Sequence, residues 1–344
     1  DKDDYRKIAV QMWYPASNIS DSLYPYIDNK IKMKYISEQL GIPQKVLQGL
    51  EEVKTNSYFK APIVNNEFPV ILFSHGLGGT KTQNSINIEY LVSHGYVVIA
   101  IDHSYDALIT ILDDNIANFN SEPGWNANIA DFRSDPGWNT ETDNITEEEF
   151  WEVRLPQINT RSRDVSFVID ELEKLKKQNF YIAKSCNIRK IGVFGHSFGG
   201  GTGIVASYSD NRILSCLNLD GWIEPVPEKI ITNGLNIPFC YIGQIQENWS
   251  SAKLNNKKLN NLHNNNKKSS YIFEVENSKH MDYADIPYLT RLTKLFGLSG
   301  KAGKTLTKDL NIFILGFFNE NLKNKSSKWI ENMNINYKTN FKSN

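Results

Sequence analysis

The stretch KIGVFGHSFGGGTGIVASY at residues 190–208 places a glycine-rich turn between two different patterns. Residues 190–194 are mostly apolar and strand-like, whereas residues 199–208 are small and suit a helix that packs closely on a sheet. Between them, GHSFG at 195–199 has the G-x-S-x-G form of a nucleophile elbow, a sharp turn that lifts its serine above the sheet. Side chains at the glycines would collide with neighbouring elements. The pattern predicts that Ser197 is a catalytic nucleophile, the alternative being a solvated serine in an ordinary turn.

Short apolar runs recur on both sides of this turn and alternate with helical patterns. They lie at 8–14, 68–73, 96–101, 190–194, 213–219, 237–242 and 271–275. Runs such as VVIAI at 97–101 are apolar on both faces, as expected for central strands of a covered parallel sheet. Helical spacing is clear at 82–93 and 164–177. We predict one α/β domain over residues 1–344, with a mostly parallel, doubly wound sheet.

Two regions break this alternation. Residues 104–155 show no clear strand and contain the similar turns SEPGWN and SDPGWN. We expect this segment to be a lid-like insertion that covers or borders the site, with a simple pair of Pro-Gly turns as the alternative. Residues 255–270 are polar and low in complexity, which predicts a mobile surface loop.

Composition argues against several classes of protein. The 344 residues carry 38 Lys and Arg against 39 Asp and Glu, a net charge of −1, whereas nucleic-acid binders usually show a basic excess. We therefore expect no nucleic-acid partner. No apolar run approaches the roughly 18 residues that a spanning helix needs. Three cysteines are too few for a disulfide-dense scaffold.

A serine hydroxyl is a poor nucleophile near neutral pH, so it needs a base and an acid that orients the base. In an α/β-hydrolase sheet the order along the chain is serine, acid, histidine, and only His263 and His280 come late enough. His263 lies in the Asn- and Lys-rich stretch, where we expect a solvated ring. His280 follows the predicted strand 271–275 at its carboxyl end, where such sheets place their sites. We predict His280 as the base.

Two carboxylates are the main candidates for the acid. Asp220 directly ends the predicted strand 213–219, and Glu247 follows the strand 237–242 after a loop. The position after the later strand is the commoner one in this fold, which favours Glu247, whereas direct placement at a strand end favours Asp220. The residues alone make Asp220 the first choice and leave Glu247 open.

The substrate carbonyl oxygen, which gains negative charge, needs hydrogen-bond donors. Two backbone N–H groups supply them in this arrangement, one from the residue after the nucleophile and one from a loop after an earlier strand. The first is Phe198. HGLGG at 75–79 follows the predicted strand 68–73 and fits the loop, with Leu77 as the second donor. The remaining histidines, which we expect to be structural, are His75, His94, His103 and His196.

Four motifs together resemble one family. They are HGLGG at 75–79, GHSFGG at 195–200, LDGW at 219–222 and HMDYAD at 280–285. This combination is similar to the platelet-activating-factor acetylhydrolases of plasma type, also called lipoprotein-associated phospholipases, and their bacterial relatives. VQMWYPA at 10–16 and FILGFFNENL at 313–322 resemble the first strand and the C-terminal helix of those relatives. GHSFGG alone is shared by many lipases and esterases, and LDGW with HMDYAD narrows the match.

The resemblance implies an α/β-hydrolase that acts without calcium, and we expect no metal or other cofactor. It implies the roles already considered: nucleophile, acid, base and two oxyanion donors at Ser197, Asp220, His280, Leu77 and Phe198. It thereby favours Asp220 over Glu247. Two departures are Gly221, where the animal enzymes usually have Ala, and the segment 104–155, which does not match closely.

The expected reaction is hydrolysis of a carboxylic ester. By resemblance, the substrate is a phospholipid with a short or oxidised acyl chain at the sn-2 position. The alternatives are a general short-chain carboxylesterase or polyester hydrolase and, in another class, a non-catalytic binding protein. A non-catalytic binding protein has no physical need for an intact serine, acid and histidine, which argues against that class.

Contact with a lipid surface is a further expectation. Because the chain lacks a basic excess, such contact would rest on apolar side chains more than on attraction to anionic head groups. Residues 34–50 form an amphipathic stretch, for which packing on the domain is favoured over an interfacial helix. The chain begins at Asp1 without a Met. We expect a secreted or periplasmic protein and leave a cytoplasmic one open.

Overall fold

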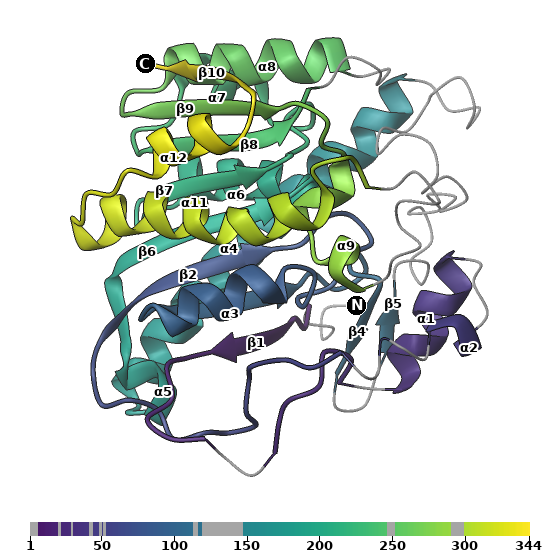
Figure 1. Cartoon of the computed structure of the whole chain (residues 1–344), viewed down its shortest axis with the longest axis vertical. Coiled ribbons are helices and arrows are strands. Elements are labelled where there is room, and N and C mark those ends of the chain that lie inside the picture. Colours follow the sequence, from purple (N-terminus) through teal and green to yellow (C-terminus); the bar gives the residue numbers. More distant parts are fainter. Residues whose placement is uncertain are drawn as a thin grey trace.

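A twisted eight-stranded sheet with helices on both faces organises the molecule (Figure 1). The computed structural model describes residues 6–19, 22–28, 30–40, 44–47, 50, 53–112, 116–118, 147–245, 252–289 and 299–344. The strand order is β1-β3-β2-β6-β7-β8-β9-β10. The inner strands pair in parallel, whereas β1 and β10 pair antiparallel at the two edges. The predicted doubly wound α/β sheet is confirmed.

Most strands have five to seven residues, and the carboxyl halves of the central strands are buried. Their bounds are β1 (Ala9–Trp13), β2 (Phe68–Ser74), β3 (Val97–Asp102), β6 (Cys186–His196), β7 (Ile213–Leu219), β8 (Phe239–Gln244), β9 (Ser270–Val275) and β10 (Thr339–Ser343). Every residue of β2 and β3 is buried, because helices cover both sides of these strands. A separate hairpin pairs β4 (Ile109–Ile111) with β5 (Ile116–Asn118).

The helices divide the interior into two cores. Their bounds are α1 (Lys30–Leu40), α2 (Gln44–Leu47), α3 (Ser85–Ser93), α4 (Glu147–Lys177), α5 (Tyr181–Lys184), α6 (Phe198–Ser209), α7 (Glu228–Asn233), α8 (Ala252–Asn265), the 3₁₀ helix η3 (His280–Tyr283), α9 (Ile286–Leu289), α11 (Gly303–Lys323) and α12 (Trp329–Asn336). Val70 and Leu72 of β2 join the core under α4, α6 and α8. Ile71 and Phe73 join the core under α3, α11 and α12, since successive side chains of a strand point to opposite faces.

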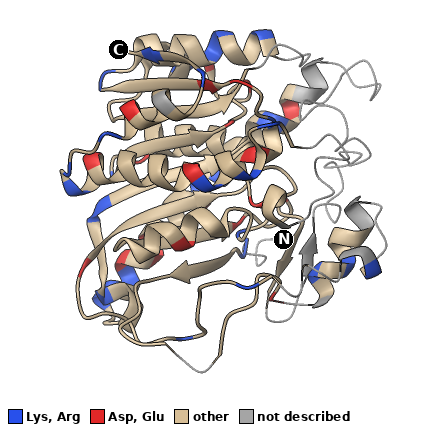
Figure 2. Cartoon of the chain, in the orientation of Figure 1, with Lys and Arg blue, Asp and Glu red and all other residues tan. Residues whose placement is uncertain are grey.

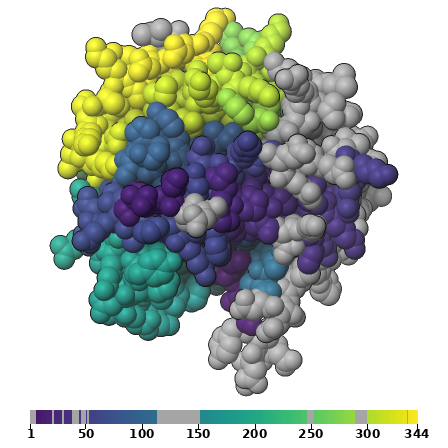
Figure 3. All heavy atoms as spheres, turned by 60° about the horizontal axis from the view of Figure 1, so that its bottom comes forward, coloured from purple at the N-terminus to yellow at the C-terminus, as the bar shows by residue number. Residues whose placement is uncertain are grey.

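Segments far apart in the sequence therefore lie side by side. Helix α11 contacts α3, and Figure 3 shows the N-terminal third of the chain between the yellow C-terminal segments and the teal segment of residues 150–190. Figure 2 shows Lys and Arg interspersed with Asp and Glu on the described elements, in keeping with the net charge of −1. Within the described part of the chain, no helix combines the length and the apolar character needed to cross a membrane.

The prediction of a mobile loop at 255–270 is wrong, because most of this stretch forms helix α8. Ala252, Leu259 and Leu262 are buried, and their spacing of seven and three residues defines one helical face. His263 is buried as well, contrary to the expected solvated ring, and its Nδ1 lies 2.8 Å from Ser270 Oγ. The few apolar residues of an otherwise polar stretch are sufficient to dock the helix on the sheet.

The segment 104–155 is described only at 104–112, 116–118 and 147–155. The described part contains the β4–β5 hairpin, although the sequence showed no clear strand there, and it ends in the first turns of α4. The rest lies outside the described residues, so its role as a covering insertion stays a prediction. The stretch 34–50 is split between α1 and α2, and its Ile36 and Leu50 share a small cluster with Met33; packing of the stretch on the rest of the domain stays a prediction.

Candidate active site

The nucleophile candidate stands alone between a strand and a helix. Strand β6 ends at His196 and α6 begins at Phe198, so Ser197 is the whole turn. Its φ of 55° and ψ of −124° are rare for a non-glycine residue and cost about 1–3 kcal/mol. Two backbone bonds hold this conformation: Ser197 N–H donates to Leu219 O at 3.0 Å, and Trp222 N–H donates to Ser197 O at 3.0 Å.

The glycines around the turn are required by close approach. A Cβ on Gly195 would lie 2.3 Å from the carbonyl of Gly199, and a Cβ on Gly199 would lie 2.0 Å from Ser74 O at the end of β2. Such distances are far below normal contact, so only glycine fits. Gly221 is constrained in the same way, because its Cβ would come 1.8 Å from Asn218 Oδ1. An Ala at this position therefore requires the Asn218 side chain to move.

Asp220 and His280 are in direct contact. Asp220 follows β7 in a left-handed conformation, with a φ of 44°, and is 2% exposed. His280 Nδ1 donates to Asp220 Oδ2 at 2.6 Å. The same carboxylate accepts from Gln244 N–H at 2.8 Å, from Gln244 Nε2 at 3.0 Å and from the Tyr241 hydroxyl at 3.2 Å. These three donors are neutral, and among the described residues no Lys or Arg pairs with Asp220.

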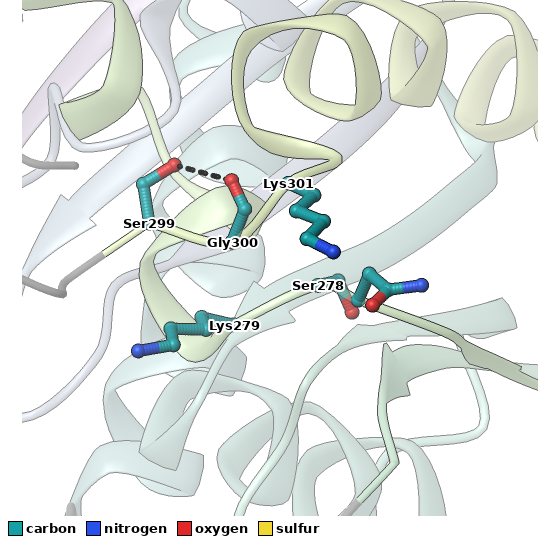
Figure 4. A pocket seen from close by; sticks show the side chains of 6 residues that line it. Ser278, Lys279, Ser299, Gly300 and Lys301 are labelled. Carbon is teal, nitrogen blue, oxygen red and sulfur yellow. Dashed lines mark hydrogen bonds between the residues drawn. The ribbon is translucent and has the colours of Figure 1, made fainter.

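A second buried carboxylate fixes the turn that carries His280. Asp282 accepts from Lys279 N–H at 2.8 Å, from Ser299 Oγ at 2.6 Å and from Gly300 N–H at 2.9 Å. A pocket of about 370 Å³ opens beside these groups, and Figure 4 shows Ser278, Lys279, Ser299, Gly300 and Lys301 around it. Neither Ser197 nor Asp220 lines this pocket.

The glycine-rich loop after β2 lies against the nucleophile. A Cβ on Gly76 would be 3.2 Å from Ser197 Cβ. Gly78 N–H donates to Asp106 O at 2.9 Å, and Gly76 N–H donates to Gln83 Oε1 at 2.8 Å. The N–H groups of Leu77 and of Phe198, the first residue of α6, have no acceptor among the described residues. Both are thus available to a substrate oxygen.

Arg161, a buried arginine that the sequence patterns did not point to, holds this loop through hydrogen bonds. Arg161 of α4 is fully buried and donates through Nη2 to His75 O and, at 3.2 Å, to Ser74 Oγ. Its Nε lies 3.8 Å from Asp106 Oδ2, and its guanidinium lies 5.0 Å from the Phe198 ring centroid. Burial raises the pKa of Asp106 to about 6, although Arg161 opposes the shift. Arg161 lies three residues before the helix predicted at 164–177, and no local pattern marked it.

The histidines expected to be structural fall into different environments. His75, His103 and His196 are buried, whereas His94 is exposed on α3's carboxyl end. The rings of His196 and His280 are in contact, with centroids 4.5 Å apart and planes tilted by 37°. The alternative acid, Glu247, lies outside the described residues.

His103 belongs to a second serine, histidine and aspartate set. Its Nε2 lies 2.9 Å from Ser74 Oγ, and its Nδ1 lies 2.8 Å from Asp164 Oδ2. Arg6 donates two bonds of 2.8 Å to the Asp164 carboxylate. Burial lowers the pKa of His103 to about 4, and the Arg161 charge acts in the same direction. Burial opposes ionisation of Asp164, but hydrogen bonds from Arg6 and His103 lower its pKa to about 2.

Known proteins match both the sequence and the fold. Platelet-activating factor acetylhydrolase from Canis lupus familiaris is 26% identical over 337 residues, which cover 91% of this chain and 71% of that protein. The Gallus gallus enzyme of the same name is 24% identical over an aligned region that covers 93% of this chain and 80% of that protein. A probable 1-alkyl-2-acetylglycerophosphocholine esterase from Arthroderma benhamiae is 25% identical over 158 residues, 46% of this chain and 32% of that protein.

The structural comparison and the family model extend over nearly the whole chain. The ferulic acid esterase from Streptomyces cinnamoneus superimposes with a TM-score of 0.69 and 21% identity, covering 93% of this chain and 84% of that one, which shows a shared fold. Residues 1–340 match the family model for platelet-activating factor acetylhydrolase, isoform II. The chain therefore belongs to the platelet-activating factor acetylhydrolase, isoform II, family.

Proposed function

We propose that this chain is a serine hydrolase that cleaves short or oxidised acyl chains from phospholipids. Membership of an acetylhydrolase family and similarity to a protein named for an acetylglycerophosphocholine ester support the substrate class. The observation that carries the mechanism is the 2.6 Å bond between His280 and Asp220, at the sheet edge where the strained Ser197 turn lies.

In the proposed reaction, His280 Nε2 takes the proton from Ser197 Oγ as the oxygen attacks the ester carbonyl. The resulting oxyanion accepts hydrogen bonds from the Leu77 and Phe198 N–H groups. The tetrahedral intermediate then collapses, the carbon–oxygen bond to the alcohol breaks, and the alcohol leaves with the proton from His280. A water molecule, deprotonated by His280, releases the acid from Ser197 by the same sequence of steps.

The environment of Asp220 supports its role as the orienting acid. Its hydrogen bond to Nδ1 holds the imidazole in the tautomer whose Nε2 accepts a proton. Because Tyr241 and Gln244, its other partners among the described residues, are neutral donors, the carboxylate charge is left to stabilise the imidazolium that forms during attack.

Covalent labelling tests the nucleophile. We expect a fluorophosphonate probe to modify the folded protein at Ser197, with the Ser197→Ala variant as the unlabelled control. A folded, unlabelled wild-type protein would overturn the proposal and favour a non-catalytic binding protein.

A rate series over acyl length tests the substrate class. We expect phospholipids with short or oxidised sn-2 chains to react faster than long-chain ones, and turnover to survive chelation of calcium. Preference for small soluble nitrophenyl esters over phospholipids would replace the proposal with a general short-chain carboxylesterase.

A further inference from the structure

A chain of hydrogen bonds links three parts of the site through a residue next to the nucleophile. Gly76 N–H donates to Gln83 Oε1 at 2.8 Å, and Gln83 Nε2 lies 3.1 Å from His196 Nδ1. On the other side of the ring, His196 Nε2 lies 3.1 Å from His280 O. His196 is 1% exposed, so water does not substitute for these partners. The chain joins the oxyanion loop, the nucleophile turn and the turn of the base.

The donors in this chain can be assigned from one end. A backbone N–H only donates, so the Gln83 oxygen faces Gly76 and its NH₂ group faces His196. An NH₂ group also only donates, so His196 Nδ1 must accept. The proton of the neutral ring is then on Nε2, from which it is donated to the carbonyl of His280.

We propose that Gln83 and His196 are positioning residues that hold His196 as the neutral Nε2–H tautomer and thereby fix the oxyanion loop and the turn of His280 relative to Ser197. The kinetic part of this inference rests on the proposed function, whereas the tautomer does not.

The charge state of His196 matters because of its neighbour. A proton on Nδ1 would set two donors against each other at Gln83 and break the chain at that point. A charged His196 ring would also face the His280 ring 4.5 Å away, which must itself become positive during attack. Burial lowers the pKa of His196 well below its usual value, and His280 adds to the shift. Among the described residues, His280 is the only titratable side chain that shifts it.

Nitrogen-15 spectra of histidine-labelled protein test the tautomer directly. His196 is assigned by the signal that disappears in the His196→Asn variant. We expect an unprotonated Nδ1 and a protonated Nε2 over the pH range of activity. A protonated Nδ1 in the wild type would overturn the inference, even if Ser197 proves to be the nucleophile. The spectra need no ester substrate, so a protein without esterase activity would leave this readout intact.

The variant Gln83→Glu replaces the NH₂ donor that faces His196 with an acceptor and so reverses the direction of that hydrogen bond. A carboxylate still accepts from Gly76 but also accepts from Nδ1, so we expect His196 to become an imidazolium. The charge beside His280 should lower kcat and move the acid limb of the kcat/KM profile to lower pH. If His196 is an imidazolium in this variant and the acid limb of the kcat/KM profile does not move, the charge of His196 is not coupled to His280 and the inference is contradicted.

Gln83→Met removes both hydrogen bonds at nearly constant volume. We expect kcat per active site, titrated with the fluorophosphonate, to fall roughly ten- to hundred-fold with KM unchanged, because the loop and turn lose their fixed geometry. The matched control is Asn87→Ala, which removes another buried amide near the start of α3, one that bonds Asn311. It should lower stability but leave kcat per titrated site and the His196 spectrum unchanged. An equal kcat per site in Gln83→Met would restrict Gln83 to a structural role and refute the proposal.

Discussion

Two serine, histidine and aspartate sets lie in the described part of the chain; both join histidine Nδ1 to an aspartate oxygen, but they differ in exposure and in the charges around them. Ser74 lies in a regular strand and is 0% exposed, whereas Ser197 is a strained single-residue turn and is 6% exposed. His103 is also 0% exposed, whereas the His280 side chain is 16% exposed. Access separates the two sets before any chemistry is considered.

The charges around the two aspartates differ as strongly. Arg6 neutralises Asp164, and Arg161 lies close enough to disfavour protonation of His103. Asp220 is held by neutral donors and keeps its charge for the His280 ring. A hydrogen-bonded set is therefore suited to catalysis only where the base can become an imidazolium and the serine meets the solvent and an oxyanion site.

The serines give the largest expected contrast. Ser197→Ala should lower kcat by about 10⁴-fold or more, because no nucleophile remains. Ser74→Ala should leave turnover per labelled site nearly unchanged and cost about 1–3 kcal/mol of unfolding free energy, since it removes a buried hydrogen-bond partner. Ester hydrolysis and urea unfolding measure the two effects. Loss of turnover in folded Ser74→Ala would show that the buried set participates in catalysis.

The next largest expected contrast is between the two aspartates, one of which should affect kcat and the other stability. Asp220→Asn is expected to cost on the order of 10⁴-fold in kcat, because the amide favours the wrong tautomer of His280. Asp164→Asn should act on stability, since it leaves Arg6 and His103 without their carboxylate. Rates per titrated site and unfolding midpoints distinguish these outcomes, and a similar kcat loss in both variants would contradict the contrast.

Arg161 connects the buried set to the candidate site. Arg161→Met should destabilise the protein by about 3–5 kcal/mol, because buried Asp106 loses the cation that acts on it most strongly, and should also lower kcat by loosening the loop of Leu77. Adding Asp106→Asn removes the buried charge and should recover most of the stability without recovering kcat. Full recovery of kcat in the double variant would show that Arg161 acts on Asp106 alone.

A dependence of stability on pH is the last expected effect, and His103 of the buried set contributes to it alongside His75 and His196, whose pKa values burial also lowers. The pKa of His103 is about 4 in the folded protein and near 6.5 in an unfolded chain, so the unfolded chain binds a proton first as pH falls. Stability from this residue is complete above pH 6.5 and is lost towards pH 4, by about 3 kcal/mol. His103→Gln should flatten the urea-unfolding free energy across that window. The lowered pKa of Asp164 acts at lower pH, from about 4 towards 2, so an unchanged slope above pH 4 would contradict the prediction.

Local patterns predicted the parts of the fold that local chemistry decides. The strand pattern and the GHSFG turn follow from demands that act within a few residues, as the close approach of Gly195 to the Gly199 carbonyl illustrates. The rule that site residues follow strands at one sheet edge identified His280 and made Asp220 the first choice, and the family resemblance favoured Asp220 over Glu247.

Features that depend on distant partners were not predictable in this way. Helix α8 is polar except for one narrow face, and only the sheet beneath it shows why it folds. Arg161 and Gln83 have no local signature, since their partners Asp106 and His196 become neighbours only after the strands assemble. Strand β10 was missed because its pairing with β9, not its own sequence, makes it a strand.

The pairing of β2 with β6 has a consequence for synthesis of the protein. Phe68 pairs with Cys186, about 120 positions further along the chain (186 − 68 = 118). At roughly 5–20 residues per second, a ribosome needs several seconds or more to supply that partner. During this interval the open edge of FPVILFS at 68–74, apolar and ready to pair, is exposed to other nascent chains. The strand that supports the Leu77 loop thus keeps one unpaired edge until residues 186–195 have been made.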